Sequence, residues 1–429
     1  MNKIVVNGGH TLYGEVFISG MKNAALPVIF ASILAKDVCI IDNIPPVGDV
    51  SSALDILSEL GAKVRRIRKN TVEIDTTYFE PEMPSVELAG KMRASAYLLG
   101  AELGRFGKAV VCWPGGCDFG TRPLDYHLKG FKSLGAECNI ENGAIFAEVE
   151  GPLSGCTINL PRPSVGATVN IIMAAVFAEG TTVIEGAARE PHIIDLAGFL
   201  NNCGANIMGA GTSVIKIKGV QKLHGTTYKI LPDMIEAGSY MAAVAAAGGM
   251  VTIRSVVPKH LDSVAASLRE MGVGVEYGSD YVTVSSNGIL KPTDITTFYY
   301  PGFPTDMHPQ FAALLAMADG VGSITEGVFD YRFRYVDQFR KMGAQIVVDT
   351  HKAMFTGKKL GGAPVEAVDL RAGVALIIAG LAAEGTTEIS NIELIERGYY
   401  NIISKFRALG ADISMRYEPD AVVTVPTVG

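Results

Sequence analysis

Several signatures that would assign a function quickly are missing from this sequence. It has no GxxxxGK[ST] loop, no GxGxxG after a predicted strand, no HExxH and no CxxC pair, and its seven histidines are dispersed. These absences argue against an ATP P-loop, a Rossmann dinucleotide site and a zinc site. We therefore expect no metal and no cofactor.

Features of secreted and membrane proteins are also scarce. The six cysteines are scattered, which argues against a disulfide framework. The first residues show no signal-peptide pattern, and the longest apolar stretches, 24–35 and 374–383, fall well short of the ~20 residues of a membrane span. The net charge of -7 gives no reason to expect nucleic acid or an anionic membrane as a partner. We expect a cytoplasmic protein whose oligomeric state stays open and is compatible with a monomer.

What the chain does contain is a sixfold internal repeat. Segments such as "LSELGAKV", "FRKMGAQIVV" and "FRALGADISM" are variants of one another. Each predicts an amphipathic helix, a glycine in the left-handed C′ position and then a strand. The shared glycines, spaced 67 to 74 residues apart, are Gly61, Gly135, Gly204, Gly272, Gly343 and Gly410.

A second series of predicted helices alternates with the first. Segments such as "GATVNIIMAAVFAEG" and "RAGVALIIAGLAAEG" are apolar on nearly every side, so they belong inside a domain. Because 429 residues exceed one ordinary core, we expect three repeats per domain. The predicted N-terminal domain spans 22–230 and carries a loop at about 112–122. The C-terminal domain would combine 1–21, including the strand-like "KIVVNG", with 231–429.

Ionisable residues gather where these helices are predicted to begin. Helix N-termini offer unpaired N–H groups and partial positive charge, so several of them in one cleft would bind an anion. Any one such residue could be a cap or a surface ion pair, but an acidic chain has little structural reason to repeat cations at equivalent points. Arginines there would suit phosphate and carboxylate groups. The candidates are Lys22, Asn23, Arg93, Arg122, Arg162, Ser164, Glu190, Asp233, Thr305, Asp306, Arg332, Asp369, Arg371 and Arg397.

One cysteine lies in an unusual setting. The stretch "WPGGCDFGTRPLDYH" (113–127) places Cys117 among glycines, which predicts a flexible loop or lid. Nearby Arg122 would favour the thiolate, and such a thiol can move a proton or attack an electrophile. An incidental loop thiol is the alternative, and it is the interpretation we adopt for Cys39, Cys112, Cys138, Cys156 and Cys203.

Motifs along essentially the whole chain resemble the UDP-N-acetylglucosamine 1-carboxyvinyltransferases, a family of enolpyruvyl transferases. They include "SGMKNAALP", "KMRASAYLLG", "PGGCDFGTRPLDYH", "FPTDMHPQF" and "ERGYYNIISKFRALGA". The resemblance implies an α/β fold of the inside-out α/β barrel type, with two similar domains of three βαβαββ repeats each. It also implies transfer of enolpyruvate from phosphoenolpyruvate to the 3′-hydroxyl of UDP-N-acetylglucosamine with release of phosphate, the first committed step of bacterial peptidoglycan precursor synthesis.

The same resemblance implies individual roles. Cys117 would protonate the methylene carbon and can form a covalent adduct with phosphoenolpyruvate, while Asp306 would be the base near the sugar hydroxyl. Lys22, Arg122 and Arg397 would hold the phosphate, Arg371 the carboxylate, Asn23 the sugar and Arg93 the diphosphate. The sugar-nucleotide site would be lined by Arg122, Pro123, Leu124, Asp125, Tyr126, Arg162, Pro163, Ser164, Val165 and Val328.

Three positions depart from the family pattern and keep alternatives open. Arg162 stands where a lysine is common, Met234 where an arginine is common, and Tyr126 where smaller or different residues occur. One alternative is enolpyruvyl transfer to shikimate 3-phosphate, and another is a non-catalytic nucleotide-sugar-binding paralogue. The second would be marked by loss of Cys117, Asp306 or Arg397, and all three are present. A purely structural repeat protein predicts no clustered charges.

Overall fold

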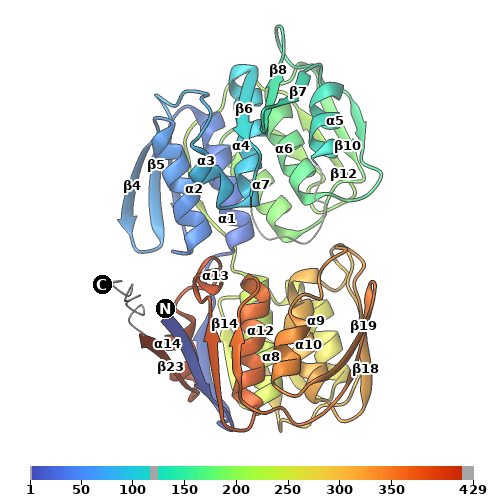
Figure 1. The fold of residues 1–429 in the computed structure, drawn as a ribbon. Helices are drawn as coiled ribbons and strands as arrows, with labels where there is room; N and C mark the ends of the chain where they lie inside the picture. Colours follow the sequence, from blue (N-terminus) through green and yellow to red (C-terminus); the bar gives the residue numbers. More distant parts are fainter. Residues whose placement is uncertain (1, 116–123, 418–429) are drawn as a thin grey trace, which may run out of the picture.

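The computed structural model describes residues 2–115 and 124–417. Cys117, Arg122 and Pro123 lie outside these ranges. Figure 1 shows an N-terminal half, coloured blue to green, above a C-terminal half, coloured yellow to red, to which the dark blue first strand also belongs. Within the described ranges, no helix combines the length and hydropathy that a bilayer crossing requires.

Six helices form the interior of the two halves. Their residues are mainly alanine, glycine, isoleucine, leucine and valine, and nearly all of them are buried. Small residues bring neighbouring helices close: a Cβ at Gly100 of one helix would lie 2.5 Å from the backbone oxygen of Asn170 on the next, so only glycine fits. The interior helices are α1 (Lys22–Ala31), α4 (Tyr97–Phe106), α6 (Val165–Ala175), α8 (Met234–Ala247), α10 (His308–Met317) and α12 (Leu370–Ala382).

A second helix in each repeat covers the interior from outside. The shared glycine that follows each of these helices has a positive φ, between 91° and 101°, as the repeat predicted. These helices are α2 (Gly48–Glu59), α5 (Asp125–Ser133), α7 (Pro191–Asn202), α9 (Asp262–Glu270), α11 (Val336–Lys341) and α14 (Ile402–Ala408). Shorter helical segments are α3 (Val86–Gly90), α13 (Glu393–Glu396) and the 3-10 turns 32–35, 93–96, 258–261 and 305–307.

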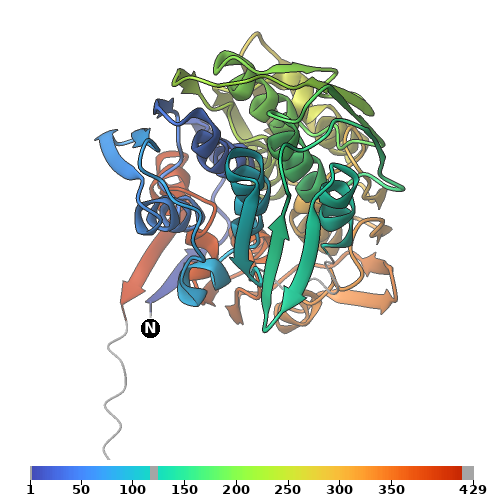
Figure 2. The same cartoon turned by 90° about the horizontal axis from the view of Figure 1, so that it is seen from above.

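Three small sheets surround the helices of the N-terminal half. In Figure 2 these helices lie at the centre of that half. In two of the sheets, a short parallel strand extends an antiparallel group. The sheet orders are β13 (Thr227–Lys229), β3 (Val38–Asp42), β5 (Thr71–Asp75), β4 (Lys63–Arg68); then β6 (Lys108–Cys112), β8 (Ala144–Glu148), β7 (Glu137–Glu141); and β11 (Asn206–Met208), β12 (Val214–Lys218), β10 (Thr181–Glu185), β9 (Thr157–Asn159).

The C-terminal half repeats this plan with three four-stranded sheets. The first strand of the chain, β1, pairs antiparallel with both β22 and β23, so it lies in the last sheet. The orders are β15 (Gly274–Tyr277), β16 (Tyr281–Ser286), β14 (Gly249–Arg254), β2 (Leu12–Phe17); then β17 (Asp294–Thr296), β18 (Val321–Thr325), β20 (Lys352–Thr356), β19 (Gln345–Asp349); and β21 (Pro364–Glu366), β22 (Thr386–Ser390), β1 (Asn2–Asn7), β23 (Asp412–Tyr417).

The α/β fold with helices inside and sheets outside is confirmed, and the described sheets remain six separate units rather than one closed barrel. Two hydrophobic cores form, one from residues between 21 and 230 and one from 4–18 together with 235–413. The two chain connections between them run side by side: Met21 N–H donates to Leu231 O (2.8 Å) and Asp233 N–H to Ser19 O (2.9 Å). On these contacts we propose the division into 22–230 and 1–21 plus 231–429.

Candidate active site

A cavity of about 440 Å³ opens between the two halves. The N-terminal ends of α1, α5, α6 and α12 reach it, because the repeats place the starts of several helices at the same boundary. Most of the predicted site residues that the structure describes line this cavity. They are Lys22, Asn23, Arg93, Asp125, Tyr126, Arg162, Pro163, Ser164, Val165, Glu190, Thr305, Asp306, Val328, Arg332, Asp369, Arg371 and Arg397.

Two described candidates do not line the cavity. Leu124 is buried in the core of the N-terminal half. Asp233 caps α8, where its carboxylate accepts hydrogen bonds from the N–H groups of Ile235 and Glu236. Asp369 caps α12 in the same way, but it also borders the cavity.

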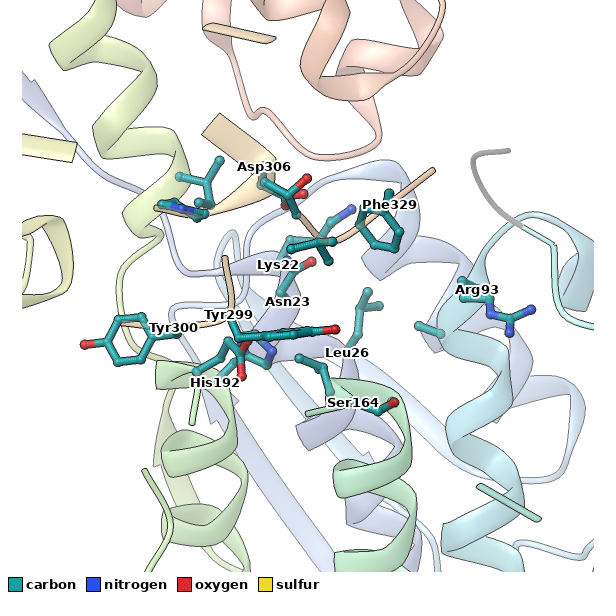
Figure 3. A pocket seen from close by; sticks show the side chains of 18 of the residues that line it. Lys22, Asn23, Leu26, Arg93, Ser164, His192, Tyr299, Tyr300, Asp306 and Phe329 are labelled. Carbon is teal, nitrogen blue, oxygen red and sulfur yellow. The ribbon is translucent and has the colours of Figure 1, made fainter. Parts of the chain in front are cut away.

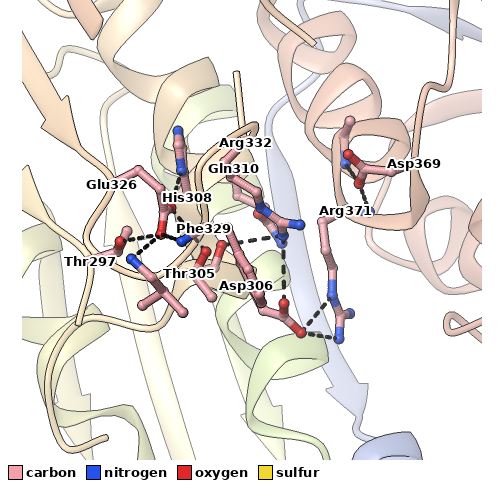
Figure 4. Close-up of polar contacts among 12 residues, drawn as sticks. Thr297, Thr305, Asp306, His308, Gln310, Glu326, Phe329, Arg332, Asp369 and Arg371 are labelled. Carbon is pink, nitrogen blue, oxygen red and sulfur yellow. Dashed lines mark hydrogen bonds and ion pairs between the residues drawn. The ribbon is translucent and has the colours of Figure 1, made fainter. Parts of the chain in front are cut away.

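Asp306 lies between two arginines of the C-terminal half (Figure 4). Its Oδ2 accepts hydrogen bonds from Arg371 Nε (3.2 Å) and an Arg371 terminal nitrogen (3.0 Å), and its Oδ1 lies 3.5 Å from an Arg332 terminal nitrogen. Burial alone would raise the pKa of Asp306, but the charges of Arg371, Arg332 and Lys22 outweigh it and hold the pKa well below its usual range. The side chain is still 30% exposed, so a ligand can reach it.

A second carboxylate bridges the two halves. Asp49, in the first turn of α2, accepts from Lys22 Nζ (2.8 Å) and from Arg397 Nε (2.8 Å). Burial would raise the pKa of Asp49, but Lys22 and Arg397 keep it below its ordinary value. The sequence reasoning missed Asp49, because an aspartate at the start of a helix is most simply a cap and nothing local points to the distant Arg397.

Neutral histidines and aromatic rings form other parts of the wall. Burial lowers the pKa of His127 to about 3 and that of His192 to about 4, so both are uncharged at neutral pH. His127 Nδ1 accepts from the Asn170 side chain (2.7 Å). In Figure 3, Tyr299 projects into the cavity between His192 and the group formed by Asp306, Lys22 and Asn23. The sequence reasoning also missed these two histidines and Tyr299.

The ends of the cavity differ in character. Figure 3 shows Asp306, Lys22 and Asn23 together, while Arg93 extends from the helix on the far side. Arg162 is exposed at the rim and lies over the Tyr126 ring, 5.9 Å from its centroid. Cations are therefore separated into an inner and an outer group, which suits a ligand with anionic groups at two places. Among the described residues, no three histidines, cysteines or carboxylates converge as a metal site.

The structure resembles solved enolpyruvyl transferases. The enolpyruvyl transferase NikO from Streptomyces tendae superposes with a TM-score of 0.88 at 25% identity, covering 97% of this chain and 99% of that chain. An EPSP synthase from Acinetobacter baumannii superposes with a TM-score of 0.75 at 19% identity, covering 97% and 100%. The second likeness shows the shared fold.

The sequence comparisons are more specific. The family model described as EPSP synthase (3-phosphoshikimate 1-carboxyvinyltransferase) matches residues 6–406. UDP-N-acetylglucosamine 1-carboxyvinyltransferase 2 of Clostridium acetobutylicum is 52% identical over 96% of this chain and 99% of that protein. UDP-N-acetylglucosamine 1-carboxyvinyltransferase 3 of Caldanaerobacter subterraneus is 51% identical over 96% and 99%. The chain therefore belongs to the enolpyruvyl transferases of the EPSP synthase family and, within them, to the UDP-N-acetylglucosamine 1-carboxyvinyltransferases.

Proposed function

We propose that this protein transfers the enolpyruvyl group of phosphoenolpyruvate to the 3′-hydroxyl of UDP-N-acetylglucosamine and releases phosphate. The observation that carries the proposal is Asp306, a carboxylate between Arg371 and Arg332 in a cavity lined by both halves. The relatives that are about half identical over nearly the whole chain carry the name of this activity. Transfer to shikimate 3-phosphate is less supported, because the EPSP synthase likeness is only 19% identical.

The separation of the cations supports one substrate at each end of the cavity. Lys22 and Arg397 at the inner end would hold the phosphate of phosphoenolpyruvate, and Arg371 its carboxylate, because arginine can bind such groups through paired hydrogen bonds. Arg93 would reach the diphosphate, and Asn23 the sugar. The uridine would lie against the rim formed by Asp125, Tyr126, Arg162, Pro163, Ser164, Val165 and Val328.

The reaction needs a base on one side of the enolpyruvyl group and an acid on the other. Asp306 would take the proton of the sugar hydroxyl as the oxygen bonds to the substituted enol carbon, and Cys117, outside the described residues, would donate a proton to the methylene carbon. The bond to phosphate then breaks as a proton leaves the new methyl group, which restores the double bond. The proton that leaves the methyl group would return to the Cys117 thiolate, and the proton held by Asp306 would leave with the phosphate, so the net products are the enol ether and hydrogen phosphate.

The arginines beside Asp306 bear on its strength as a base. With Arg371 and Arg332 engaged on its carboxylate, Asp306 is ionised but weakly basic. When the carboxylate of phosphoenolpyruvate takes hydrogen bonds from Arg371, Asp306 loses part of its stabilisation and becomes more basic. The base would therefore be activated when phosphoenolpyruvate binds.

Such an activity would place the protein at the start of bacterial peptidoglycan precursor synthesis, in the cytoplasm, with consequences for cell shape and division. Both substrates are small molecules, and the expectation of no nucleic-acid or membrane partner stays a prediction. The thiol of Cys117 would also make the protein a target of fosfomycin.

The test is phosphate release from phosphoenolpyruvate with UDP-N-acetylglucosamine, with shikimate 3-phosphate, or with no acceptor. We expect release only with the sugar nucleotide, and a fall of about 10² to 10⁴ in turnover for Asp306→Asn, as for loss of a general base. Release only with shikimate 3-phosphate would establish the alternative acceptor. Tight sugar-nucleotide binding without any release would instead identify a binding paralogue.

A further inference from the structure

A buried carboxylate behind the cavity wall collects an unusual number of donors. Glu326 follows β18 directly, and its side chain is fully buried. It does not border the cavity, and neither the repeat nor the charged residues at helix starts point to it. Its two oxygens accept five hydrogen bonds: from Thr297 Oγ1 (2.7 Å), Val328 N (2.9 Å), Phe329 N (3.2 Å), Thr305 Oγ1 (2.9 Å) and His308 Nδ1 (2.7 Å).

Three of these five donors belong to two separate stretches of the chain that line the cavity (Figure 4). Thr305, in the first stretch, directly precedes Asp306, while Val328 and Phe329 form the second stretch, and all four residues line the cavity. One carboxylate, that of Glu326, therefore bonds both to the residue next to the proposed base and to the residues that line the proposed sugar-nucleotide site. Its Oε2 serves the Thr305 side and its Oε1 serves Val328 and Phe329.

The charge states of Glu326 and His308 agree with this geometry. Burial would raise the pKa of Glu326, but the hydrogen bonds from His308, Thr297 and Val328 lower it to about 2. Burial lowers the pKa of His308, although Glu326 opposes that shift, so the imidazole is neutral and donates its Nδ1–H. At neutral pH the carboxylate consequently accepts from all five groups, and no group in the network has to lose a proton.

A further contact links this network to the ion pairs of the base. A terminal nitrogen of Arg332 donates to Thr305 O (3.4 Å) and lies 3.5 Å from Asp306 Oδ1. A shift of Thr305 would therefore move the Asp306 backbone and alter its contact with Arg332. The Thr305 hydroxyl therefore connects the buried carboxylate to the charged site.

We infer that Glu326 is a positioning residue, which fixes the position of the Asp306 carboxylate relative to the part of the cavity wall formed by Val328 and Phe329. The inference rests on the proposed function, because it assigns Asp306 the role of base. Displacing catalytic groups by about 1 Å can cost about 10²-fold in rate. Loss of the anion should therefore reduce turnover and weaken the sugar nucleotide together. Phosphoenolpyruvate should be affected less, because Lys22 and Arg397, which would hold its phosphate, bond to Asp49 rather than to Asp306, and only Arg371 is shared with Asp306.

The principal variant is Glu326→Gln, which keeps the size of the side chain but turns an N–H₂ group toward groups that are themselves donors. We expect kcat to fall about 100-fold and KM for UDP-N-acetylglucosamine to rise, with a clearly smaller change in KM for phosphoenolpyruvate. Thr305→Val should reproduce the fall in kcat, because it removes the hydroxyl that joins Glu326 to the base. The matched control is Ser323→Ala on β18, which removes a partly buried hydrogen bond to Asp294 (2.6 Å) whose two residues do not line the cavity.

Three results would overturn the inference: wild-type turnover in Glu326→Gln, a parallel rise of both KM values, or the same kinetic defect in Ser323→Ala. The last two would show a general loss of structure. If Glu326→Gln does not fold, Thr305→Val decides, and a wild-type kcat in that variant would also overturn it. Failure of the proposed function is seen separately, as a wild-type protein without acceptor-dependent phosphate release, and it would remove the base whose placement is inferred.

Discussion

Replacing Asp49 by asparagine removes the counter-ion of two cations at once. Lys22 Nζ and Arg397 Nε each lie 2.8 Å from its carboxylate, and their side chains are 10% and 21% exposed. Asparagine keeps the shape of the side chain and one acceptor oxygen, so the change is mainly one of charge. The variant should leave two partly buried cations close together without the carboxylate that they share.

The size of the effect follows from burial. Two unit charges about 4 Å apart near a protein surface attract by about 4 kcal/mol before desolvation is subtracted. Removing one partner of a buried pair costs about 3–5 kcal/mol, and because water still reaches Arg397 we expect the lower end, about 3 kcal/mol. For a unit of about 200 residues, that lowers the midpoint of thermal unfolding by roughly 6–12 °C. The matched control is Asp55→Asn, an exposed residue of the same helix, with a change of no more than about 0.5 kcal/mol.

The pH dependence has a definite sign. Because the pKa of Asp49 is lowered in the folded protein, its contribution to stability is present above the unfolded value, about 4, and is lost as the pH falls through the lowered pKa. Wild type and Asp49→Asn should therefore differ at pH 7 and converge in strongly acidic solution. A difference that persisted unchanged below pH 3 would show that charge is not its cause.

The same variant should bind phosphate more tightly. In the wild-type protein an incoming phosphate has to compete with Asp49 for Lys22 and Arg397, and in the variant it becomes their counter-ion. We expect inorganic phosphate to bind about tenfold more tightly, equivalent to about 1.4 kcal/mol, in calorimetric titration, and to restore much of the lost unfolding midpoint. Unchanged stability, or weaker phosphate binding in Asp49→Asn than in wild type, would refute the reasoning.

Two further changes test other parts of the chain. Burial raises the pKa of Glu102 on α4 to about 9, and the carboxyl accepts only a 3.3 Å hydrogen bond from Val110 N. An unfolded glutamate ionises near pH 4.3. Because Glu102 stays protonated in the folded protein up to about pH 9, the wild-type protein loses stability as the pH rises between these two values. Glu102→Gln should therefore be more stable than wild type by on the order of 3 kcal/mol at pH 7. Thermal unfolding midpoints that differ equally at pH 4 and pH 8 would contradict this. Fosfomycin should alkylate Cys117, more readily with UDP-N-acetylglucosamine present, and Cys117→Ser should lose most activity near pH 7. If mass spectrometry finds the peptide that contains Cys117 unmodified, or if the variant keeps the wild-type rate, Cys117 does not have the proposed role.

The sequence predicted what depends on local rules. Glycines such as Gly61 and Gly410 take the positive φ that ends each amphipathic helix, because that requirement is set by neighbours in the chain. The repeat also placed most helix starts, and with them Lys22 and Arg371, at one boundary. A helix-start rule cannot separate a cap from a ligand-binding residue, however, and it selected Asp233, which caps α8 and lies outside the cavity lining.

Residues whose role depends on distant contacts were not predictable in this way. Asp49 and Arg397 are separated by 348 positions, and Glu326 receives hydrogen bonds from residues up to 29 positions away. In the sequence, Asp49 and Glu326 are ordinary acidic residues, one at the start of a helix and the other just after a strand. Met234, in contrast, was singled out as a departure from the family pattern, and it does line the cavity.

Two aspartates explain how several cations can lie close together around one cavity. Asp49 pairs with Lys22 and Arg397, and Asp306 pairs with Arg371 and Arg332, so each pair of cations shares one internal anion and its charge is partly offset before any substrate arrives. In the proposed reaction an incoming phosphate or carboxylate would compete with that anion, which would moderate affinity and allow phosphate to leave. Asp49 would have no proton to accept from the substrates. Asp306 would face the sugar hydroxyl and gain basicity when Arg371 turns to phosphoenolpyruvate, so that binding of one substrate would prepare the attack of the other.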